Sequence, residues 1–126
     1  MIAYLDTNVV LWLASGALAR IRPAARRALE RADLLVSPIV LVELEYLFEI
    51  ERIRISARDA QIKIETEIGV RICDLPFTQV SAVALDEKWT RDPFDRIIVA
   101  QAKANGLAPL ISADREIAAH YPRTIW

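Results

Sequence analysis

The fold is decided by the opening stretch Ile2-Ala3-Tyr4-Leu5-Asp6-Thr7-Asn8. Its first four residues form a short, mostly apolar run, which is typical of a buried strand. Asp6 stands where that strand would end. In open parallel sheets, ligands bind beyond the carboxyl ends of the strands, so a carboxylate at this position indicates a candidate site. The question is then which other acidic residues the chain brings to the same edge.

The rest of the chain alternates short apolar runs with helical stretches. Further strands are expected at 34–36, 70–73, 109–112 and 123–126. Helices are expected at 7–13, 23–32, 38–52, 56–68, 77–89, 93–105 and 114–120. Thr7 or Asn8 could cap the first helix, and Ser37 precedes a proline at the first position of another. This alternation predicts parallel βαβ units, and therefore a single α/β domain over residues 1–126.

The composition excludes several kinds of site. Cys73 is the one cysteine and His120 the one histidine, which excludes an internal disulfide and the multi-cysteine and two-histidine zinc motifs. A metal site would have to be built mainly of carboxylates, whose oxygens favour Mg²⁺ or Mn²⁺. No apolar run is long enough for a membrane span and no basic stretch precedes the first one, so a cytoplasmic protein is expected.

Glu43 lies in the middle of an apolar stripe on the helix predicted from Pro38. At about 100° per residue, Ile39, Leu47 and Ile50 all fall within about 60° of it. A lone buried carboxylate is costly unless it is paired or bound to a cation. The alternative is that Glu43 sits at the edge of the stripe, where it would reach solvent or pair with an arginine.

Three further acids each have a local explanation. Asp92 is a good N-cap, and Asp95 three residues later would favour the positive end of the helix dipole. Asp95 nevertheless shares a face with Val99 and Ala102, which points it inward. Asp114 follows the strand predicted at 109–112 and could simply cap the short helix after it.

The placement of the acids is more informative than any one of them. Asp6 and Asp114 each follow a strand, and Glu43 lies in the second turn of a helix that follows a strand. In a parallel sheet these three converge on one edge, and Asp95 joins them if its helix lies across that edge. Four carboxylates in one cleft repel one another unless cations neutralise them, so we expect a divalent metal there.

At these residues the sequence resembles a PIN domain, specifically the VapC-type toxin ribonucleases of toxin–antitoxin pairs. The resemblance covers essentially the whole chain. It rests on four motifs in order, namely Leu5-Asp6-Thr7-Asn8, the helix start from Ser37 to Glu43, Asp92-Pro93-Phe94-Asp95-Arg96 before an apolar helix, and Ser112-Ala113-Asp114. The second aspartate motif is the most specific of them. One departure is Glu51-Arg52, where relatives often carry glycine-arginine, so the turn there is expected to differ locally.

The resemblance implies a three-layer fold with a parallel sheet of four to five short strands in the order 3-2-1-4-5, flanked by helices. It also implies that Asp6, Glu43, Asp95 and Asp114 form a catalytic site holding one or two Mg²⁺ or Mn²⁺ ions, with Asp92 as an extra acid. Asn8 and Ser112 match polar positions near the metal. The further implications are an RNA substrate, a homodimer and a cognate antitoxin that blocks the site.

A local basic segment adds candidates for substrate contact. Five arginines fall between residues 20 and 31, opposed only by Glu30. We hypothesise that Arg26, Arg27 and Arg96 hold the RNA backbone. A solvated helix surface explains the segment at least as well on sequence alone.

Two rival classes are open, namely a phosphoryl-transfer protein, either a receiver or a phosphatase, and a pure binding module whose acids are caps and surface charges. A phosphoryl-transfer receiver would need a lysine late in the sheet, but Lys63, Lys88 and Lys103 all fall in predicted helices. A phosphatase with a nucleophilic aspartate would want a second aspartate where Asn8 stands. A pure binding module would show no response of its melting temperature to Mg²⁺ or Mn²⁺.

Overall fold

The computed structural model describes residues 1–126 and is built on a five-stranded, all-parallel sheet with the strand order β3-β2-β1-β4-β5. The strands are β1 (Ile2–Leu5), β2 (Asp33–Val36), β3 (Arg71–Ile72), β4 (Leu110–Ile111) and β5 (Thr124–Ile125). The opening strand is therefore central, and Tyr4 pairs with Leu35 on one side and with Leu110 on the other. The predicted strand order is confirmed.

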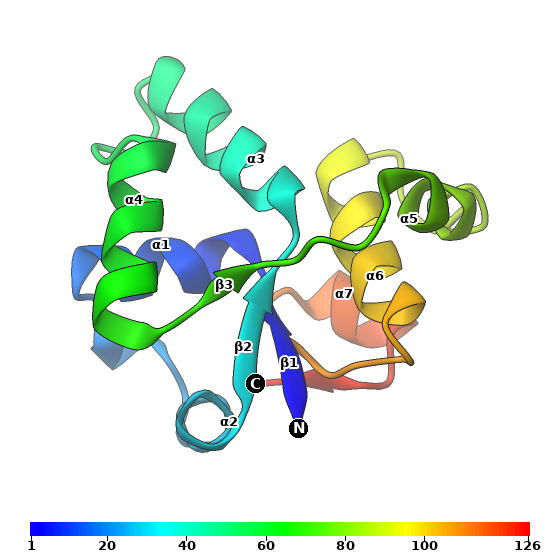
Figure 1. Ribbon diagram of the computed structural model, residues 1–126, viewed down its shortest axis with the longest axis horizontal. Helices are drawn as coiled ribbons and strands as arrows, with labels where there is room; N and C mark the ends of the chain where they lie inside the picture. Colours follow the sequence, from blue (N-terminus) through cyan, green and yellow to red (C-terminus); the bar gives the residue numbers. More distant parts are fainter.

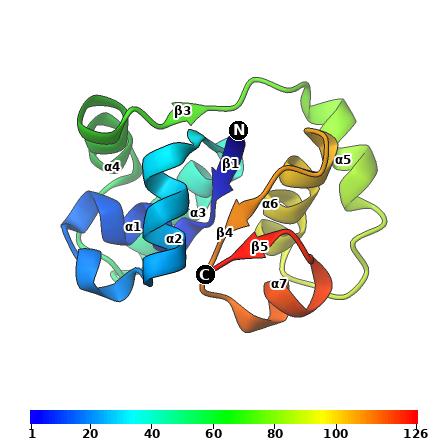
Figure 2. The same ribbon diagram turned by 90° about the horizontal axis from the view of Figure 1, so that it is seen from below.

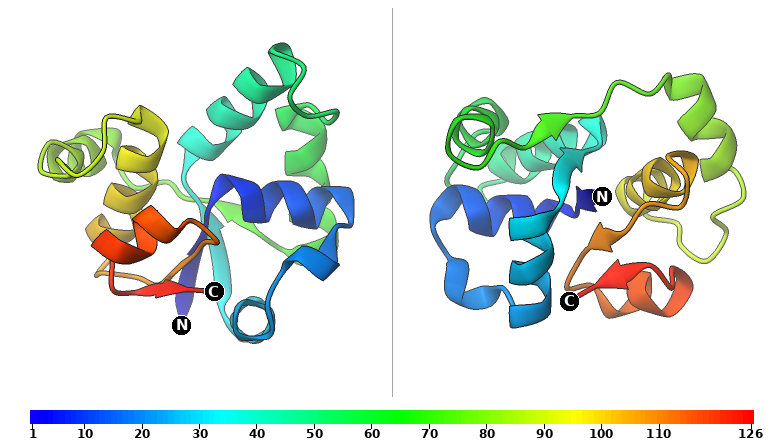
Figure 3. Two further views of the ribbon diagram at one scale, coloured as in Figure 1. Left: turned by 180° about the vertical axis from the view of Figure 1, so that it is seen from behind. Right: turned by 60° about the horizontal axis from the view of Figure 1, so that its bottom comes forward.

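The helices gather in two groups on opposite sides of the central strands (Figures 1 and 2). One group holds α1 (Thr7–Ser15), the 3₁₀ helix η1 (Leu18–Arg20), α2 (Pro23–Arg31), α4 (Ala57–Lys63) and the π-helix η2 (Ile64–Ile68). The other holds α5 (Phe77–Ala84), α6 (Pro93–Ala104) and α7 (Arg115–His120). Helix α3 (Pro38–Glu49) rises from the end of β2, and the rear view in Figure 3 shows α1 leaving the tip of β1.

None of these helices combines the length and apolar character needed to cross a membrane.

The central strand is buried because helices cover both faces of the sheet. Ala3, Tyr4 and Leu5 are at most 1% exposed. Fully burying a side chain such as Leu5 contributes about 1.5–3 kcal/mol. From α6, Ile98 and Val99 join the same core, so the helix that carries Asp95 is packed in place by its apolar face.

A buried polar cluster ties the sheet to α6. The Tyr4 hydroxyl lies 3.1 Å from Cys73 Sγ and accepts a hydrogen bond of 2.8 Å from Asn105 Nδ2. Gln101 Nε2 donates to Cys73 Sγ at 3.3 Å. Every buried side-chain nitrogen and oxygen of the chain has a partner, so this cluster orients β1 against α6 without leaving an unpaired polar group.

Some predicted boundaries are wrong. The helix expected over 77–89 ends at Ala84, because Glu87 and Trp89 turn inward and bond to each other. The first helix is capped by neither Thr7 nor Asn8. Asp6 is the N-cap, and its carboxylate accepts the Thr7 N–H.

The helix expected over 38–52 ends at Glu49, where Glu51 adopts the left-handed conformation that usually selects glycine, with φ of 61°. The Arg52 N–H bonds back to the Leu47 carbonyl and the Glu51 N–H to the Phe48 carbonyl. This is the Schellman pattern that ends many helices. The backbone at the Glu51-Arg52 turn therefore has the shape that a glycine would favour, although a glutamate stands there.

We expect Glu51→Gly to stabilise the protein. The left-handed conformation costs a non-glycine residue about 1–2 kcal/mol, while glycine loses about 0.5–1 kcal/mol more backbone entropy on folding, so the gain should be up to about 1 kcal/mol in the free energy of unfolding. Urea denaturation measures it. Glu49→Gly, inside α3, is the matched control and should destabilise by about 1 kcal/mol. A loss of stability in Glu51→Gly would contradict the reading of this turn.

Candidate metal and active site

Asp6 joins β1 to α1 and is 6% exposed. Its Oδ1 accepts the Thr7 N–H at 2.8 Å, and its Oδ2 accepts the Ser112 hydroxyl at 2.6 Å. Ser112 directly follows β4, the neighbour of β1, so the parallel pairing of these strands brings the two side chains together. Burial raises the Asp6 pKa above its ordinary value, the two hydrogen bonds oppose that rise, and the charges of Asp114 and Asp92 add to it.

Glu43 points from α3 toward the start of α1. Its Oε1 accepts a short hydrogen bond from the Thr7 hydroxyl. The side chain is half-buried, and burial raises its pKa against the effect of that bond, with Asp6 and Asp92 raising it further. The hydrogen-bond partner of Glu43 is therefore Thr7, and not an arginine, which the sequence had left open as an alternative.

Asp95 lies half-buried in the first turn of α6. Burial is the largest cause that raises its pKa to about 7, and the charges of Asp92, Asp6, Asp114 and Glu43 follow in that order. Four other acids act on this one carboxylate, so the first turn of α6 lies near them.

Asp92 and Asp114 are N-caps, as their local sequence indicated. Asp92 Oδ1 accepts the amides of Phe94 and Asp95 at 2.8 and 3.2 Å. Asp114 Oδ1 accepts the amides of Glu116 and Ile117 at 2.8 and 3.0 Å. In both residues Oδ1 accepts the helix amides, whereas Oδ2 makes no hydrogen bond. Capping therefore leaves Oδ2 available to a ligand.

The other predicted site residues divide clearly. Ser112 contacts Asp6 and also accepts the Asp114 N–H at 3.1 Å, so it bridges two of the acids. Asn8 is exposed on α1, and its side chain bonds to none of the acids. The expected cleft is not found, since no cavity of the structure is lined by these carboxylates.

The three candidate arginines are engaged to different degrees. Arg26 donates to the carbonyls of Ile21 and Leu18 at 2.9 and 2.5 Å, which fastens α2 to η1. Arg96 Nε donates to the Thr90 carbonyl at 3.0 Å in the loop before α6. Arg27 is exposed and bonds to no other group.

The donor set fits a hard divalent cation, although it is not assembled around one. All candidate ligands are carboxylate oxygens, which suit Mg²⁺ or Mn²⁺. No group of three or more His, Cys, Asp or Glu side chains is arranged to hold an ion. Several of the oxygens accept hydrogen bonds, and the mutual repulsion of the acids favours separation. Chelation therefore requires rotation of side chains, most simply those of Glu43 and Asp95, which lie on helix surfaces.

Thr7 is the site residue that sequence reasoning missed. It is 4% exposed, and it links Asp6 through its backbone amide to Glu43 through its hydroxyl. The only signal was its place between Asp6 and Asn8, where it was considered as a helix cap. The contact depends on how α3 packs on α1, which the local sequence does not state.

We expect Thr7→Val to raise the Glu43 pKa and weaken binding of Mn²⁺ by about 10-fold or more, because second-shell hydrogen bonds typically contribute that much to metal affinity. Valine keeps the shape of the side chain and removes the donor. Thr7→Ser keeps the donor and should bind Mn²⁺ nearly as the wild type does. Calorimetric titration measures both. Equal Mn²⁺ affinity in Thr7→Val and the wild type would show that the hydroxyl does not support Glu43.

The fold and the acidic edge together define a nuclease-like α/β domain, and comparison with known proteins identifies the family. The family model of the PIN domain matches residues 3–121, so the chain belongs to the PIN domain family. It is 35% identical over 127 residues to the ribonuclease VapC22 of Mycobacterium tuberculosis, covering 97% of this chain and 96% of that protein.

Solved structures agree on the fold. A toxin–antitoxin complex from Klebsiella pneumoniae has a TM-score of 0.66 at 21% identity, covering 98% of this chain and 96% of that one. VapBC2 from Rickettsia felis, bound to a DNA fragment from its promoter, has a TM-score of 0.61 at 17% identity with the same coverage. At these identities the similarity establishes the architecture alone.

Proposed function

We propose that the protein is the toxin of a type II toxin–antitoxin pair and acts as a metal-dependent endoribonuclease. The observation that carries the proposal is the set of five acids near one sheet edge, where burial, and then the charges of the neighbouring acids, raise the pKa of Asp6, Glu43 and Asp95. Such repulsion is relieved by a divalent cation. The similarity to ribonuclease VapC22 over nearly the whole chain supports RNA as the substrate.

Each acid has a definable part in this chemistry. Asp6, Glu43 and Asp95 would hold one or two Mg²⁺ or Mn²⁺ ions, and Asp114 and Asp92 would contribute directly or through water. Bound metal would activate the attacking water and neutralise charge on the scissile phosphate. The acidic side chains would orient that metal, and its positive charge would keep their carboxylates anionic.

Residues around the acids support this division of roles. Ser112 fixes the Asp6 carboxylate, and Thr7 fixes that of Glu43. His120, the one histidine, stacks on Trp89 with ring centroids 4.9 Å apart, at the opposite end of α7 from Asp114. The proposed mechanism assigns it no role as a general base. A receiver-type mechanism would need a lysine beside Asp6. The ammonium of Lys103 pairs instead with Glu87.

The RNA backbone would be held by cations near the acidic edge. Arg96 uses only Nε in its bond to Thr90, so its terminal nitrogens remain free to reach a phosphate. Arg27 is free, whereas Arg26 would have to give up bonds to two carbonyls. Helix α2, which carries Arg26 and Arg27, leads into the amino end of β2 and lies at the opposite end of the strands from Asp6 (Figure 1). Of the three candidates, Arg96 is therefore the best supported.

Metal removal tests the proposal directly. We expect the purified protein to cleave single-stranded RNA in Mg²⁺ or Mn²⁺, to lose all cleavage in EDTA and to recover it when the metal is restored. In parallel, metal at about 100 times its dissociation constant should stabilise the fold by about 2.7 kcal/mol through mass action, seen as a higher melting temperature. Undiminished cleavage in EDTA would overturn the assignment.

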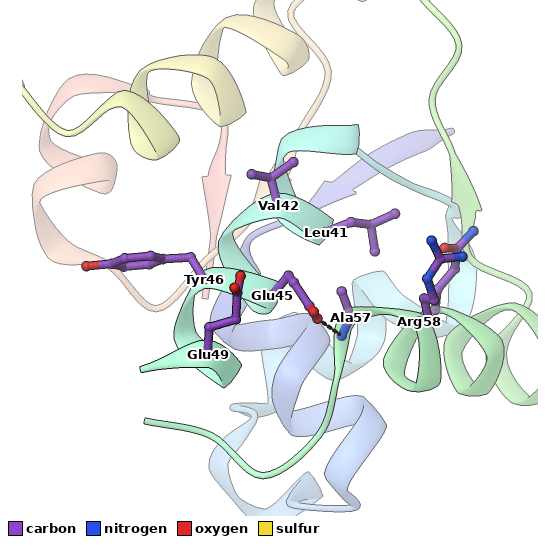
Figure 4. A pocket seen from close by; sticks show the side chains of 8 residues that line it. Leu41, Val42, Glu45, Tyr46, Glu49, Ala57 and Arg58 are labelled. Carbon is purple, nitrogen blue, oxygen red and sulfur yellow. Dashed lines mark hydrogen bonds between the residues drawn. The ribbon is translucent and has the colours of Figure 1, made fainter. Parts of the chain in front are cut away.

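The surface formed by α3 and α4 would suit the binding of an antitoxin. A cavity of about 520 Å³ lies between these helices, and Glu45 Oε1 accepts the Ala57 N–H there at 3.1 Å. Figure 4 shows its lining side chains, among them Leu41, Val42 and Tyr46. A partner segment seated there would lie on the helix that carries Glu43. Inhibition of RNA cleavage by the product of the adjacent reading frame is the measurement that checks this partner.

A homodimer would cover a second apolar surface. A cavity of about 350 Å³ lies between the start of α3, α5 and α6, and Val42 and Phe77 on its rim are 56% and 65% exposed. Single exposed apolar side chains are ordinary, but several around one cavity are typical of an interface. Light scattering on the purified protein tests this, and a monomer at micromolar concentration would contradict it.

A further inference from the structure

Glu87 is a buried carboxylate that the acidic site does not use. It is 3% exposed and lies in the loop between α5 and α6; Asp6 is the only other acid buried to this degree. A buried charge is costly unless it is paired and hydrogen-bonded. The burial of the Glu87 charge, near the elements that carry Asp92, Asp95 and Asp114, therefore needs a physical explanation.

Both Glu87 oxygens are occupied by named donors. Lys103 Nζ lies 2.5 Å from Glu87 Oε1, and this ion pair is the one salt bridge of the chain. Trp89 Nε1 donates a hydrogen bond to Glu87 Oε2 at 2.7 Å. The Lys103 side chain is 30% exposed, whereas that of Glu87 is only 4% exposed. The carboxylate is thus the buried centre of the arrangement.

The two donors also reach the end of α7. Lys103 Nζ lies 5.8 Å from the centroid of the Tyr121 ring, within cation–π range. The indole of Trp89 stacks on the His120 ring at an interplanar angle of 13°. We call these five side chains, Glu87, Trp89, Lys103, His120 and Tyr121, the Glu87 cluster. It joins three segments, namely the loop 85–92, the second half of α6 and the end of α7.

Those three segments carry three acids of the site. The loop ends at Asp92, α6 has Asp95 in its first turn, and α7 is capped by Asp114. Helix α6 packs mainly against α5 and α3, and α7 mainly against β5. Apolar residues of both helices also share the main core, and the Glu87 cluster adds a polar link between them. Figures 1 and 2 show both helices on the same side of the central strands.

Trp89 holds the loop by packing on the main core and stacking on His120. Residues 85–92 form no helix or strand. The loop is tied to the first turn of α6 by the bond from Arg96 Nε to the Thr90 carbonyl, and to the second half of α6 by the Glu87–Lys103 pair. Asp92 caps α6 and stays bonded to its first turn. Loss of the pair would therefore free residues 85–91 and let the start of α6, with Asp92 and Asp95, shift relative to α7 and Asp114.

From this geometry we propose that Glu87 is a positioning residue of the metal site. Through Lys103, Trp89 and the end of α7 it keeps the start of α6, with Asp92 and Asp95, in place relative to Asp114, so that rotation of the acidic side chains can close the site on a divalent cation. The inference rests on the proposed function, since it assigns Glu87 a role in the metal site that the function needs.

The test is the double variant Glu87→Gln/Lys103→Met, which removes both charges and approximately keeps the shapes. Because the two charges go together, no unpaired buried charge remains and the protein should fold. We expect its affinity for Mn²⁺ and its kcat for RNA cleavage to fall by about 10–100-fold, as for loss of a second-shell support, with KM for RNA unchanged. Lys103→Arg keeps the ion pair and should behave nearly as the wild type.

Measured by calorimetry well below the melting temperature, Mn²⁺ affinity separates positioning from stability, because general destabilisation does not alter the affinity of molecules that are folded. Glu65→Gln/Lys63→Met makes the same change of charge at exposed positions of α4 and η2, and should leave Mn²⁺ affinity unchanged. If the Glu87 and Lys103 double variant also keeps wild-type Mn²⁺ affinity and kcat, the cluster is only structural and the inference is overturned.

Two further outcomes are also decisive. Should the double variant fail to fold, Glu87→Asp keeps the charge but shortens the side chain, and wild-type Mn²⁺ affinity and kcat in that variant would overturn the inference. If the wild type binds Mn²⁺ but cleaves no RNA, the proposed function fails, while the comparison of Mn²⁺ affinities still decides the role of Glu87.

Discussion

Asp6→Asn should abolish RNA cleavage, with a loss of about 1000-fold or more, because we propose this residue as the central ligand of a metal that would activate water and neutralise the phosphate. It should also raise the melting temperature of the metal-free protein. Asp6 is 6% exposed among four other acids, and its pKa is raised by burial. Removing its charge therefore removes a cost that the fold otherwise bears.

The fold should survive this substitution because asparagine can take over the local bonds. The amide oxygen can accept the Thr7 N–H, and the amide nitrogen can donate to the Ser112 hydroxyl, reversing the present direction of that bond. RNA cleavage and thermal melting in EDTA are the two measurements. Asp59→Asn, an exposed aspartate in the first turn of α4, is the matched control and should retain cleavage. Full cleavage by Asp6→Asn would refute the metal site.

Asp95→Asn should remove much of the pH dependence of stability in the metal-free protein. The folded-state pKa of Asp95 is raised from 3.8 to about 7, chiefly by burial. Between these values the folded state binds the proton and the unfolded state does not. Stability therefore falls as pH rises from about 4 to about 7, and the cost is constant above that range.

The comparison of wild type with Asp95→Asn isolates this effect from other titrating groups. In EDTA, the two proteins should be similar in stability near pH 4, and the variant should become progressively more stable than the wild type up to about pH 7. Urea denaturation at several pH values measures the difference. A difference that does not change with pH would show that Asp95 is not perturbed by its neighbours. The same titration implies weaker metal binding below pH 7, because a protonated Asp95 is a poor ligand.

Much of the site could be predicted from the sequence because its signals are local. The apolar run ending at Asp6 indicated a strand with a carboxylate at its tip, and the apolar stripe around Glu43 indicated an inward-facing acid. Parallel sheets bring strand ends to one edge, so the convergence of Asp6, Glu43 and Asp114 followed from the alternation of strands and helices. The capping signals at Asp92 and Asp114 were also correct, and the structure shows that capping leaves an oxygen free at each.

Other features could not be predicted, because they depend on contacts between distant segments. The bond from Thr7 to Glu43 needs the packing of α3 on α1, and the bond from Ser112 to Asp6 spans 106 residues of sequence. Helix α5 ends early because Glu87 is drawn inward to Lys103, a residue 16 positions away on the next helix. Local propensity cannot register a charge partner that only the folded chain supplies.

The sequence by itself thus determined the order of the elements and the placement of Asp6, Glu43 and Asp114 at the carboxyl ends of the strands. These depend on hydrophobic periodicity, caps and the parallel topology, which short segments specify. The resemblance to the PIN family added the central place of the first strand and Asp92 as an extra acid. Only the tertiary structure decided how the acids are held, namely Thr7 on Glu43, Ser112 on Asp6 and Asp114, and the Glu87 cluster behind Asp92 and Asp95. The physical reason is that hydrogen bonds and ion pairs act over a few ångströms, and packing alone sets which residues come that close.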